Sequence, residues 1–131
     1  MPQSSNTQAT AMGQAIVIRF EGRAIAAALD DTPDARAFAA LLPLTLTLED
    51  YAATEKIADL PSKLPARDAA TGHTPSVGDI AYYAPWGNLA IFHKPFRHSP
   101  GLVKLGRLTE EGDVARLAKP GSVRVEIAKA P

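Results

Sequence analysis

The sequence predicts a mainly β domain in which about seven or eight short strands close into a barrel or pack as a sandwich. Short apolar runs alternate with polar residues at a period of two, and one well-marked amphipathic helix interrupts them. The 11 prolines fall mostly in the connections between these runs, where they end one element before the next begins. Closure has a physical motive, because an open sheet of this size would leave unpaired edges that invite aggregation.

The first two strands form a predicted β-hairpin. Gln14 to Phe20 carries apolar side chains at every second position, and Glu21-Gly22 follows as a turn signal. Arg23 to Leu29 can then return as the second strand. This second run is rich in alanine, which has a low strand propensity, so its assignment depends on the first strand as its partner.

A helix comes next, where the apolar period changes from that of a strand to that of a helix. Thr32 is a good N-cap, Pro33 suits the first helical position, and Pro43 ends the run. The apolar stripe consists of Ala35, Phe38, Ala39 and Leu42. Because only one face is apolar, we expect this helix to lie on the open end or the edge of the sheet.

The remaining elements are short and are separated by irregular connections rich in proline or glycine. Predicted strands cover Leu44 to Leu48, Tyr51 to Ile57, Asp79 to Ala84, Asn88 to His93, Leu102 to Leu108 and Ser122 to Ala128. The turn Pro85-Trp86-Gly87 joins the strand Asp79 to Ala84 to the strand Asn88 to His93. Asp113 to Ala118 is predicted as a second short helix. Asp68 to Gly78 is predicted as a loop.

One domain of residues 14–131 is predicted, preceded by a disordered tail of residues 1–13 without the features of a signal peptide. Either Met1 or Met12 can serve as the start. The chain has no cysteine, which excludes disulfides and cysteine nucleophiles and fits a cytoplasmic location. No apolar run approaches the roughly 20 residues of a membrane span. The formal net charge of zero gives no electrostatic footprint for nucleic acid or an anionic membrane.

Large rings concentrate in one stretch of the chain. The aromatic residues there are Tyr82, Tyr83, Trp86, Phe92 and Phe96, and the polar residues beside them are Asn88, His93, Lys94, Arg97 and His98. Apolar walls with a few directional polar groups are typical of sites that hold organic ligands or peptides. The alternative is that most of these rings fill the core. Trp86 is different because it lies in a turn, where a large ring favours contact with a partner.

Other chemistries lack the residue patterns that they need. His93 and His98 do not have a ligand spacing on one strand face, and no HExxH motif accompanies them, so no metal site is predicted. No serine occupies a nucleophile elbow, nothing places two carboxyls across a cleft, and no glycine-rich loop opens a helix for a nucleotide. No cofactor is therefore predicted, and His73 is assigned to a loop with a solvated imidazole.

The run GDIAYYAPWGNLAIFHKPF, residues 78–96, followed by GLVKLGRL, residues 101–108, resembles the bacterial cyclophilin-like domain family. The segment LLPLTLTLEDYAATEKIADLP and the order of hairpin and capped helix match that family as well, so the resemblance spans about Gln14 to Ile127. It implies a closed cyclophilin-like β-barrel of about eight strands with one or two short helices.

The resemblance to true cyclophilins stops at their catalytic strand. Their FHR-type sequence, with an arginine aimed at the prolyl amide, has no match, and the corresponding region here offers Glu55 and Lys56. Prolyl isomerisation must lower a barrier of about 18–20 kcal/mol around a partial double bond. A cationic donor does so by favouring the twisted state. Arg97 or Lys56 could replace the missing arginine in principle.

The first functional hypothesis is a binding module whose groove holds a small ligand or an extended peptide. The residues predicted to bind it are Glu55, Tyr83, Trp86, Asn88, Phe92 and His93. One alternative is a peptidyl-prolyl isomerase with a non-standard donor. Another is a structural or oligomeric domain in which the aromatic cluster forms a homodimer contact. Neither nucleic acid nor a membrane is expected as a partner.

Overall fold

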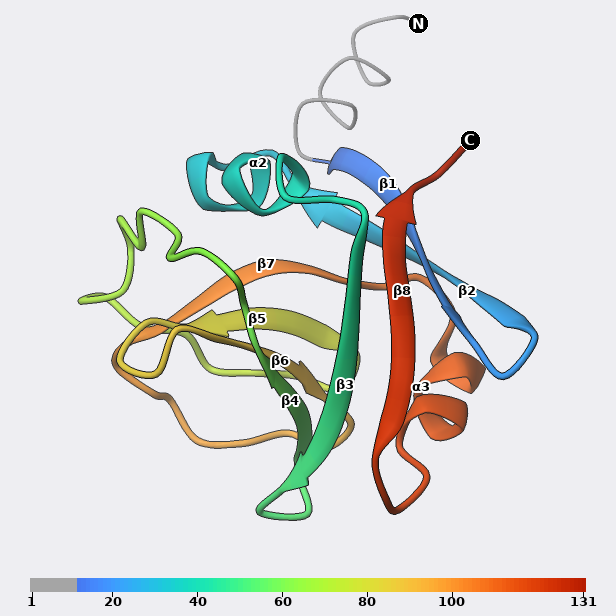
Figure 1. Cartoon of the computed structure of the whole chain (residues 1–131). Helices are drawn as coiled ribbons and strands as arrows, with labels where there is room; N and C mark the ends of the chain where they lie inside the picture. The colour runs from blue at the N-terminus through green and yellow to red at the C-terminus, as the bar shows by residue number, and fades with distance from the viewer. Residues whose placement is uncertain (1–11) are drawn as a thin grey trace, which may run out of the picture.

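The computed structural model describes residues 12–131, and the first 11 residues of the predicted tail lie outside the described residues. The described chain forms eight strands and two helices (Figure 1). The strands are β1 (Met12–Phe20), β2 (Arg23–Asp30), β3 (Leu44–Tyr51), β4 (Glu55–Asp59), β5 (Asp79–Tyr83), β6 (Asn88–Phe92), β7 (Leu102–Leu108) and β8 (Val123–Lys129). The helices are α2 (Pro33–Ala39) and α3 (Glu111–Leu117). Met12 and Gly13, which the sequence assigned to the tail, therefore belong to β1.

The strands close into one antiparallel barrel in the order β1-β2-β7-β5-β6-β4-β3-β8, and β8 pairs back to β1. The prediction of a mainly β fold is confirmed, and the barrel is formed rather than the sandwich. Each of these strands has a partner on both sides, so none of them presents a free edge that could template aggregation.

The predicted strand from Tyr51 to Ile57 is wrong in its bounds, because it spans a turn between two strands. Tyr51 ends β3, and Glu55 directly opposite it begins β4. Ala52 and Ala53 make the turn with φ values of 54° and 56°, in the left-handed region. Glycine or asparagine usually marks such turns, so two alanines give no signal in the sequence. The turn places Tyr51 and Glu55 side by side, which matters for the site described below.

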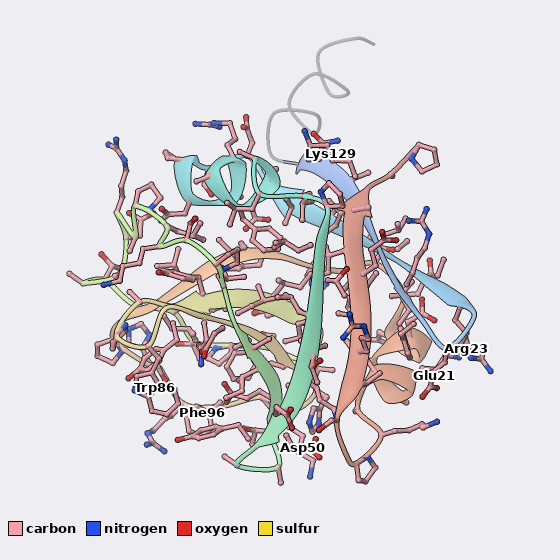
Figure 2. The ribbon with its side chains drawn as sticks, viewed as in Figure 1. Glu21, Arg23, Asp50, Trp86, Phe96 and Lys129 are labelled. Atoms are coloured by element: carbon pink, nitrogen blue, oxygen red, sulfur yellow. The ribbon has the colours of Figure 1, made fainter. Side chains whose placement is uncertain are left out.

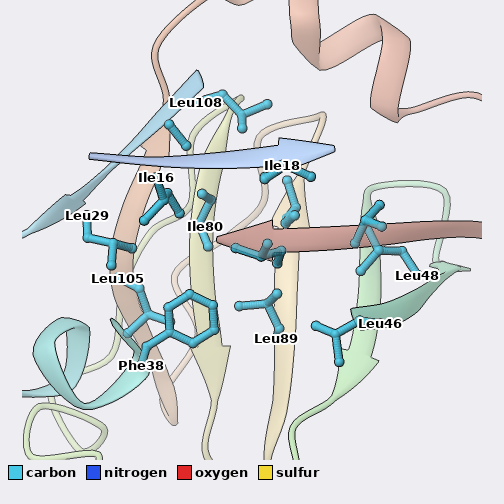
Figure 3. Packing of buried hydrophobic residues seen from close by; sticks show 14 of the residues in the cluster. Ile16, Ile18, Leu29, Phe38, Leu46, Leu48, Ile80, Leu89, Leu105 and Leu108 are labelled. Carbon is cyan, nitrogen blue, oxygen red and sulfur yellow. The ribbon is translucent and has the colours of Figure 1, made fainter. Parts of the chain in front are cut away.

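Alternate residues of each strand point into the barrel and fill it (Figure 3). The buried interior includes Ile16, Ile18, Leu48, Ile80, Leu89 and Leu105. Phe38 of α2 is fully buried against this core, so α2 covers one end of the barrel as its single apolar stripe predicted. The predicted N-cap is confirmed, because Thr32 Oγ1 accepts a hydrogen bond from the backbone N–H of Ala35 at 3.1 Å.

A second, smaller apolar cluster lies on the outer face of the barrel. Its buried members are Ala81, Ala90, Phe92 and Leu102. These residues alternate with the inward-facing side chains of the same strands, so β5 and β6 are buried on both faces. Burial on the outer face shows that other side chains cover these strands, and the candidate site lies among those covering side chains.

The long connection between β4 and β5 is fastened to the barrel by two buried carboxylates. Asp34 of α2 accepts hydrogen bonds from the backbone N–H groups of Ala66 at 2.7 Å and Arg67 at 3.1 Å. Asp79 lies 2.8 Å from His73, measured between Oδ2 and Nε2. The prediction of a solvated His73 imidazole is therefore wrong, because the ring is partly buried and bound to a buried acid.

Candidate functional site

A pocket of about 190 Å³ lies on the outer face of the barrel, and we call it the outer pocket. Its lining residues are Tyr51, Glu55, Tyr83, Trp86, Asn88, Phe92, Phe96, Arg97, Ser99 and Leu102. Figure 2 shows Trp86 and Phe96 on the same flank of the barrel. Pockets for drug-sized ligands measure roughly 300–1,000 Å³. The outer pocket is therefore suited to a small molecule or to a single side chain of a larger ligand.

The strand register explains which side chains meet in the outer pocket. In one row across the sheet, Tyr51 of β3 lies opposite Glu55 of β4, and Glu55 lies opposite Phe92 of β6. In a second row, Asn88 of β6 lies opposite Tyr83 of β5. The two rows are separated along β6 by about 13 Å, the length of four residues of extended strand. The pocket therefore has an acidic end at Glu55 and an amide end at Asn88.

Trp86 connects the two rows from the turn between β5 and β6. Its ring makes edge-to-face contacts with Tyr51 and Tyr83, with centroids 5.3 Å apart in both pairs and planes at 85° and 83°. Such aromatic pairs contribute about 0.5–1.5 kcal/mol each beyond their buried area. Trp86 nevertheless stays 53% exposed. Its ring is thus held in place by the two tyrosines and still offers surface to a ligand.

Asn88 is the buried polar group of the outer pocket. The residue is only 3% exposed, and no described residue donates a hydrogen bond to its Oδ1 atom. A buried acceptor without a partner costs about 1–3 kcal/mol of stability. A ligand that donates a hydrogen bond to this oxygen would remove that cost, so Asn88 marks the point where a ligand can gain a directional contact.

Glu55 is the carboxylate of the outer pocket. Thr54 Oγ1 donates a hydrogen bond to Glu55 Oε2 at 3.2 Å. Loss of hydration raises the pKa of Glu55 above its ordinary value, and the Thr54 hydrogen bond opposes that rise. Glu55 makes no ion pair with any residue from 12 to 131. Its charge is therefore partly desolvated without a compensating cation from the described chain.

Replacing Glu55 with glutamine is expected to raise the melting temperature at pH 7, by roughly 1–2 °C after allowance for solvent screening. The folded state raises the pKa of Glu55, so folding favours the protonated form of this side chain. The resulting stabilisation is fully present below the pKa of the unfolded state, and it is lost as pH rises through the pKa of the folded state. Thermal unfolding of the variant and the natural protein should therefore converge below about pH 4.

The control is Glu110→Gln, which removes an exposed carboxylate that makes no capping hydrogen bond at the start of α3. Equal stabilisation of both variants at pH 7 would contradict the prediction, because loss of any negative charge would then suffice.

The two cations suggested as replacements for the cyclophilin arginine lie in different places. Lys56 is 1% exposed and points into the barrel, where its Nζ atom lies 2.8 Å from Asp50 Oδ1 and donates to two backbone carbonyls. It does not line the outer pocket. Arg97 does line the pocket, and its guanidinium carbon lies 4.6 Å from the centroid of the Phe96 ring. Of the two, Arg97 alone is placed to contact a ligand in the outer pocket.

The structure brings the predicted binding residues together, with one exception. Those that line the outer pocket are Glu55, Tyr83, Trp86, Asn88 and Phe92. The exception is His93, which lies just beyond the end of β6 and does not line the pocket. His93 borders a separate small void beside Lys56. Burial lowers the pKa of His93, and the positive charges of Lys94 and Lys56 lower it further.

Several lining residues were absent from the predicted set: Tyr51, Phe96, Arg97, Ser99 and Leu102. Tyr51 was missed because the turn after it gives no sequence signal. Phe96 and Arg97 belong to the aromatic stretch, and that clustering could have identified them. Ser99 follows them, and its backbone pairs with that of His73 in an isolated bridge that no local pattern reveals.

Two further observations concern the described residues as a whole. No group of three or more His, Asp or Glu side chains within residues 12–131 is arranged to hold a metal ion. No helix in the same range has the length and apolar character needed to cross a membrane. The expectations of no metal and no cofactor stay predictions.

Comparison with known proteins supports the resemblance read from the sequence. A family model described as the cyclophilin-like family matches residues 18–128. The chain is also similar to the solution structure of a hypothetical protein from Archaeoglobus fulgidus, with 19% identity, a TM-score of 0.61, and coverage of 89% of this chain and 95% of that chain. At this identity the likeness shows the fold alone.

No curated protein matches the chain. The solved relative is archaeal, so the bacterial origin implied by the resemblance stays a prediction. The family match runs from β1 to β8 and takes in the strands that build the barrel and the outer pocket. This chain therefore belongs to the cyclophilin-like family.

Proposed function

We propose that the chain is a binding module whose outer pocket holds a small ligand or one side chain of an extended peptide. The observation that carries the proposal is Asn88, a buried amide whose Oδ1 atom has no partner among the described residues. Buried polar atoms in folded proteins are almost always hydrogen-bonded, so this oxygen in the wall of a pocket is a place where a ligand can supply the missing donor. We place this function in the cytoplasm, which the lack of cysteine fits.

The walls of the outer pocket support binding of a partly apolar ligand. Phe92 is almost fully buried in the pocket wall, and the exposed rings that line the pocket are those of Tyr51 and Trp86. Apolar surface that a ligand removes from water on these rings contributes about 25 cal/mol per Å². Asn88 and Arg97 then supply directional contacts, which fix the orientation of the ligand rather than most of its affinity.

Replacing Asn88 with alanine is expected to weaken binding of a blocked Ala-Pro tetrapeptide about tenfold, the loss of one buried hydrogen bond. The chain contains one tryptophan, so the fluorescence of Trp86 reports on the pocket without interference. The melting temperature of the variant should be equal to or above that of the natural protein, because the substitution removes a buried polar atom without a protein partner.

Thr45→Ala serves as the control, since Thr45 is exposed on β3 and does not line the outer pocket. Unchanged affinity in Asn88→Ala, together with a clear loss of stability, would show that Asn88 serves the fold and would remove the main support of the proposal.

A second candidate function is prolyl isomerisation, and one observation favours it. Arg97 lines the outer pocket beside Phe96, so a cationic donor and an apolar wall are neighbours there. That pairing is what a twisted prolyl amide needs, although Arg97 lies after β6 instead of on the strand that carries the cyclophilin arginine. An exchange measurement on the same peptide separates the two functions and is described at the end of the Discussion.

A further inference from the structure

We propose that the outer pocket selects organic cations, with an ammonium group held by the Glu55 carboxylate among the rings of Tyr51, Trp86 and Phe92. The inference rests on the proposed binding function, because it names the class of ligand that the same pocket takes. Three observations carry it: the arrangement of the rings, the unpaired carboxylate between them, and the buried acceptor at the other end.

The rings of the outer pocket meet at nearly right angles. Trp86 stands at 85° to Tyr51 and at 83° to Tyr83, so the three rings form adjoining walls and not a flat stack. The face of an aromatic ring carries negative partial charge, and several faces around one space attract a cation strongly. The Arg97 guanidinium, 4.6 Å from the centroid of Phe96, already occupies such a position at one edge of the cluster.

Glu55 lies within this aromatic enclosure. The register places it directly opposite Tyr51 on one side and Phe92 on the other. It is partly buried, its hydrogen bond from Thr54 comes from a neutral group, and no described residue forms an ion pair with it, because the Arg97 guanidinium of the same pocket lies over the Phe96 ring instead. An ammonium ion of a ligand would supply the missing counter-charge and would also meet the π faces of Tyr51 and Trp86.

Asn88 provides the second contact and sets the shape of the ligand. Its free Oδ1 atom lies in the row about 13 Å along the strand from the row of Glu55, and both side chains line the same pocket. A compact cation with a hydroxyl or N–H donor at its other end fits this arrangement. Choline has that form, with a quaternary ammonium at one end and a hydroxyl at the other, and it suits a pocket of about 190 Å³.

The test compares choline with its uncharged isostere 3,3-dimethylbutan-1-ol, which has the same shape and hydroxyl but a carbon in place of the cationic nitrogen. Binding is followed by the fluorescence and the indole N–H resonance of Trp86, the one tryptophan of the chain. We expect saturable binding of choline at least tenfold tighter than that of the isostere. Glu55→Gln should weaken choline binding about tenfold and leave the isostere unchanged, whereas Glu110→Gln should change neither.

The blocked Ala-Pro tetrapeptide distinguishes the ways in which this can fail. Equal affinity for choline and its isostere would overturn the selection for cations and leave the binding function standing. The same conclusion would follow if the peptide perturbed Trp86 and choline did not. If neither the peptide nor choline perturbed Trp86, both the selection for cations and the proposed binding function would be overturned.

Discussion

Replacing Lys56 with methionine is expected to lower the free energy of unfolding by about 2–4 kcal/mol, or roughly 10 °C in melting temperature. Lys56 lies inside the barrel at 1% exposure and uses all three of its N–H donors. Its Nζ atom donates to the carbonyl of Lys119 at 2.7 Å and to that of Gly121, and it pairs with Asp50 at 2.8 Å. Methionine preserves most of the packing volume and removes every one of these contacts.

The cost is large because the lysine joins segments that are distant in the sequence. Its two carbonyl partners belong to the connection between α3 and β8, while Lys56 itself belongs to β4. Asp50 completes the link, since its Oδ2 atom accepts the N–H of Gly121 at 2.6 Å. The hydrogen bond from Lys56, and to a smaller extent the one from Gly121, hold the pKa of Asp50 below its ordinary value. Removing the ammonium leaves both carbonyls without this donor.

Lys94→Met is the matched control, because Lys94 is exposed just beyond β6 and surface substitutions of this kind change stability by about 0.5 kcal/mol or less. Chemical denaturation of the two variants gives the comparison. A Lys56→Met protein as stable as the natural one would contradict the prediction. It would mean that desolvation of the buried ammonium already cancels its hydrogen bonds, as happens for some buried ion pairs.

Replacing Trp86 with alanine is expected to weaken binding of the Ala-Pro tetrapeptide by about 30-fold or more, with a loss of about 1–3 kcal/mol of stability from its two edge-to-face contacts. The ring forms the exposed wall of the outer pocket and holds Tyr51 and Tyr83 in position through its edge-to-face contacts. Because Trp86 is already 53% exposed, its removal uncovers little of the barrel interior. Calorimetric titration and thermal unfolding measure the two quantities separately.

Trp86→Phe is the control for this substitution, because it retains an aromatic wall and should keep most of the affinity. A large loss of stability in Trp86→Ala with unchanged binding would show that the ring serves the fold. Sedimentation tests the homodimer alternative on the same variants. A natural protein that is dimeric and a Trp86→Ala variant that is monomeric would assign the exposed rings to a subunit contact instead of a ligand.

Much of the fold could be predicted because its local signals agree with its global arrangement. The hairpin from β1 to β2, the capped helix α2 and the strands on either side of Trp86 all carry period, cap or turn signals in the sequence. The barrel itself could not be derived from those signals alone. Closure depends on pairing β1 with β8 across more than one hundred residues, and period-two patterns do not reveal partners so far apart.

The site was predictable where its residues are close in sequence and unpredictable where they are not. Tyr83, Trp86 and Asn88 surround one turn, so their clustering was visible. Tyr51 lies at the same pocket because the register between β3 and β4 puts it opposite Glu55. That register cannot be read from the sequence. His93 is next to Phe92 in the sequence, yet it lies beyond the end of β6 and borders a separate void, so adjacency in the sequence did not bring it to the pocket. Its part in binding stays a prediction. The sequence offered Lys56 as a possible replacement for the cyclophilin arginine, but this side chain is buried inside the barrel and does not line the outer pocket.

The most direct test of the binding function is an NMR titration of isotope-labelled protein with the blocked Ala-Pro tetrapeptide, read together with the cis-trans exchange peaks of the peptide. We expect saturable shifts at the amides of Trp86 and Asn88 and at the Trp86 indole. The cis-trans exchange of the peptide should stay uncatalysed and take tens of seconds or longer. Accelerated exchange that is lost in Arg97→Gln would make the protein an isomerase. Absence of shifts at Trp86 and Asn88 with this peptide and with choline alike would contradict a binding site in the outer pocket.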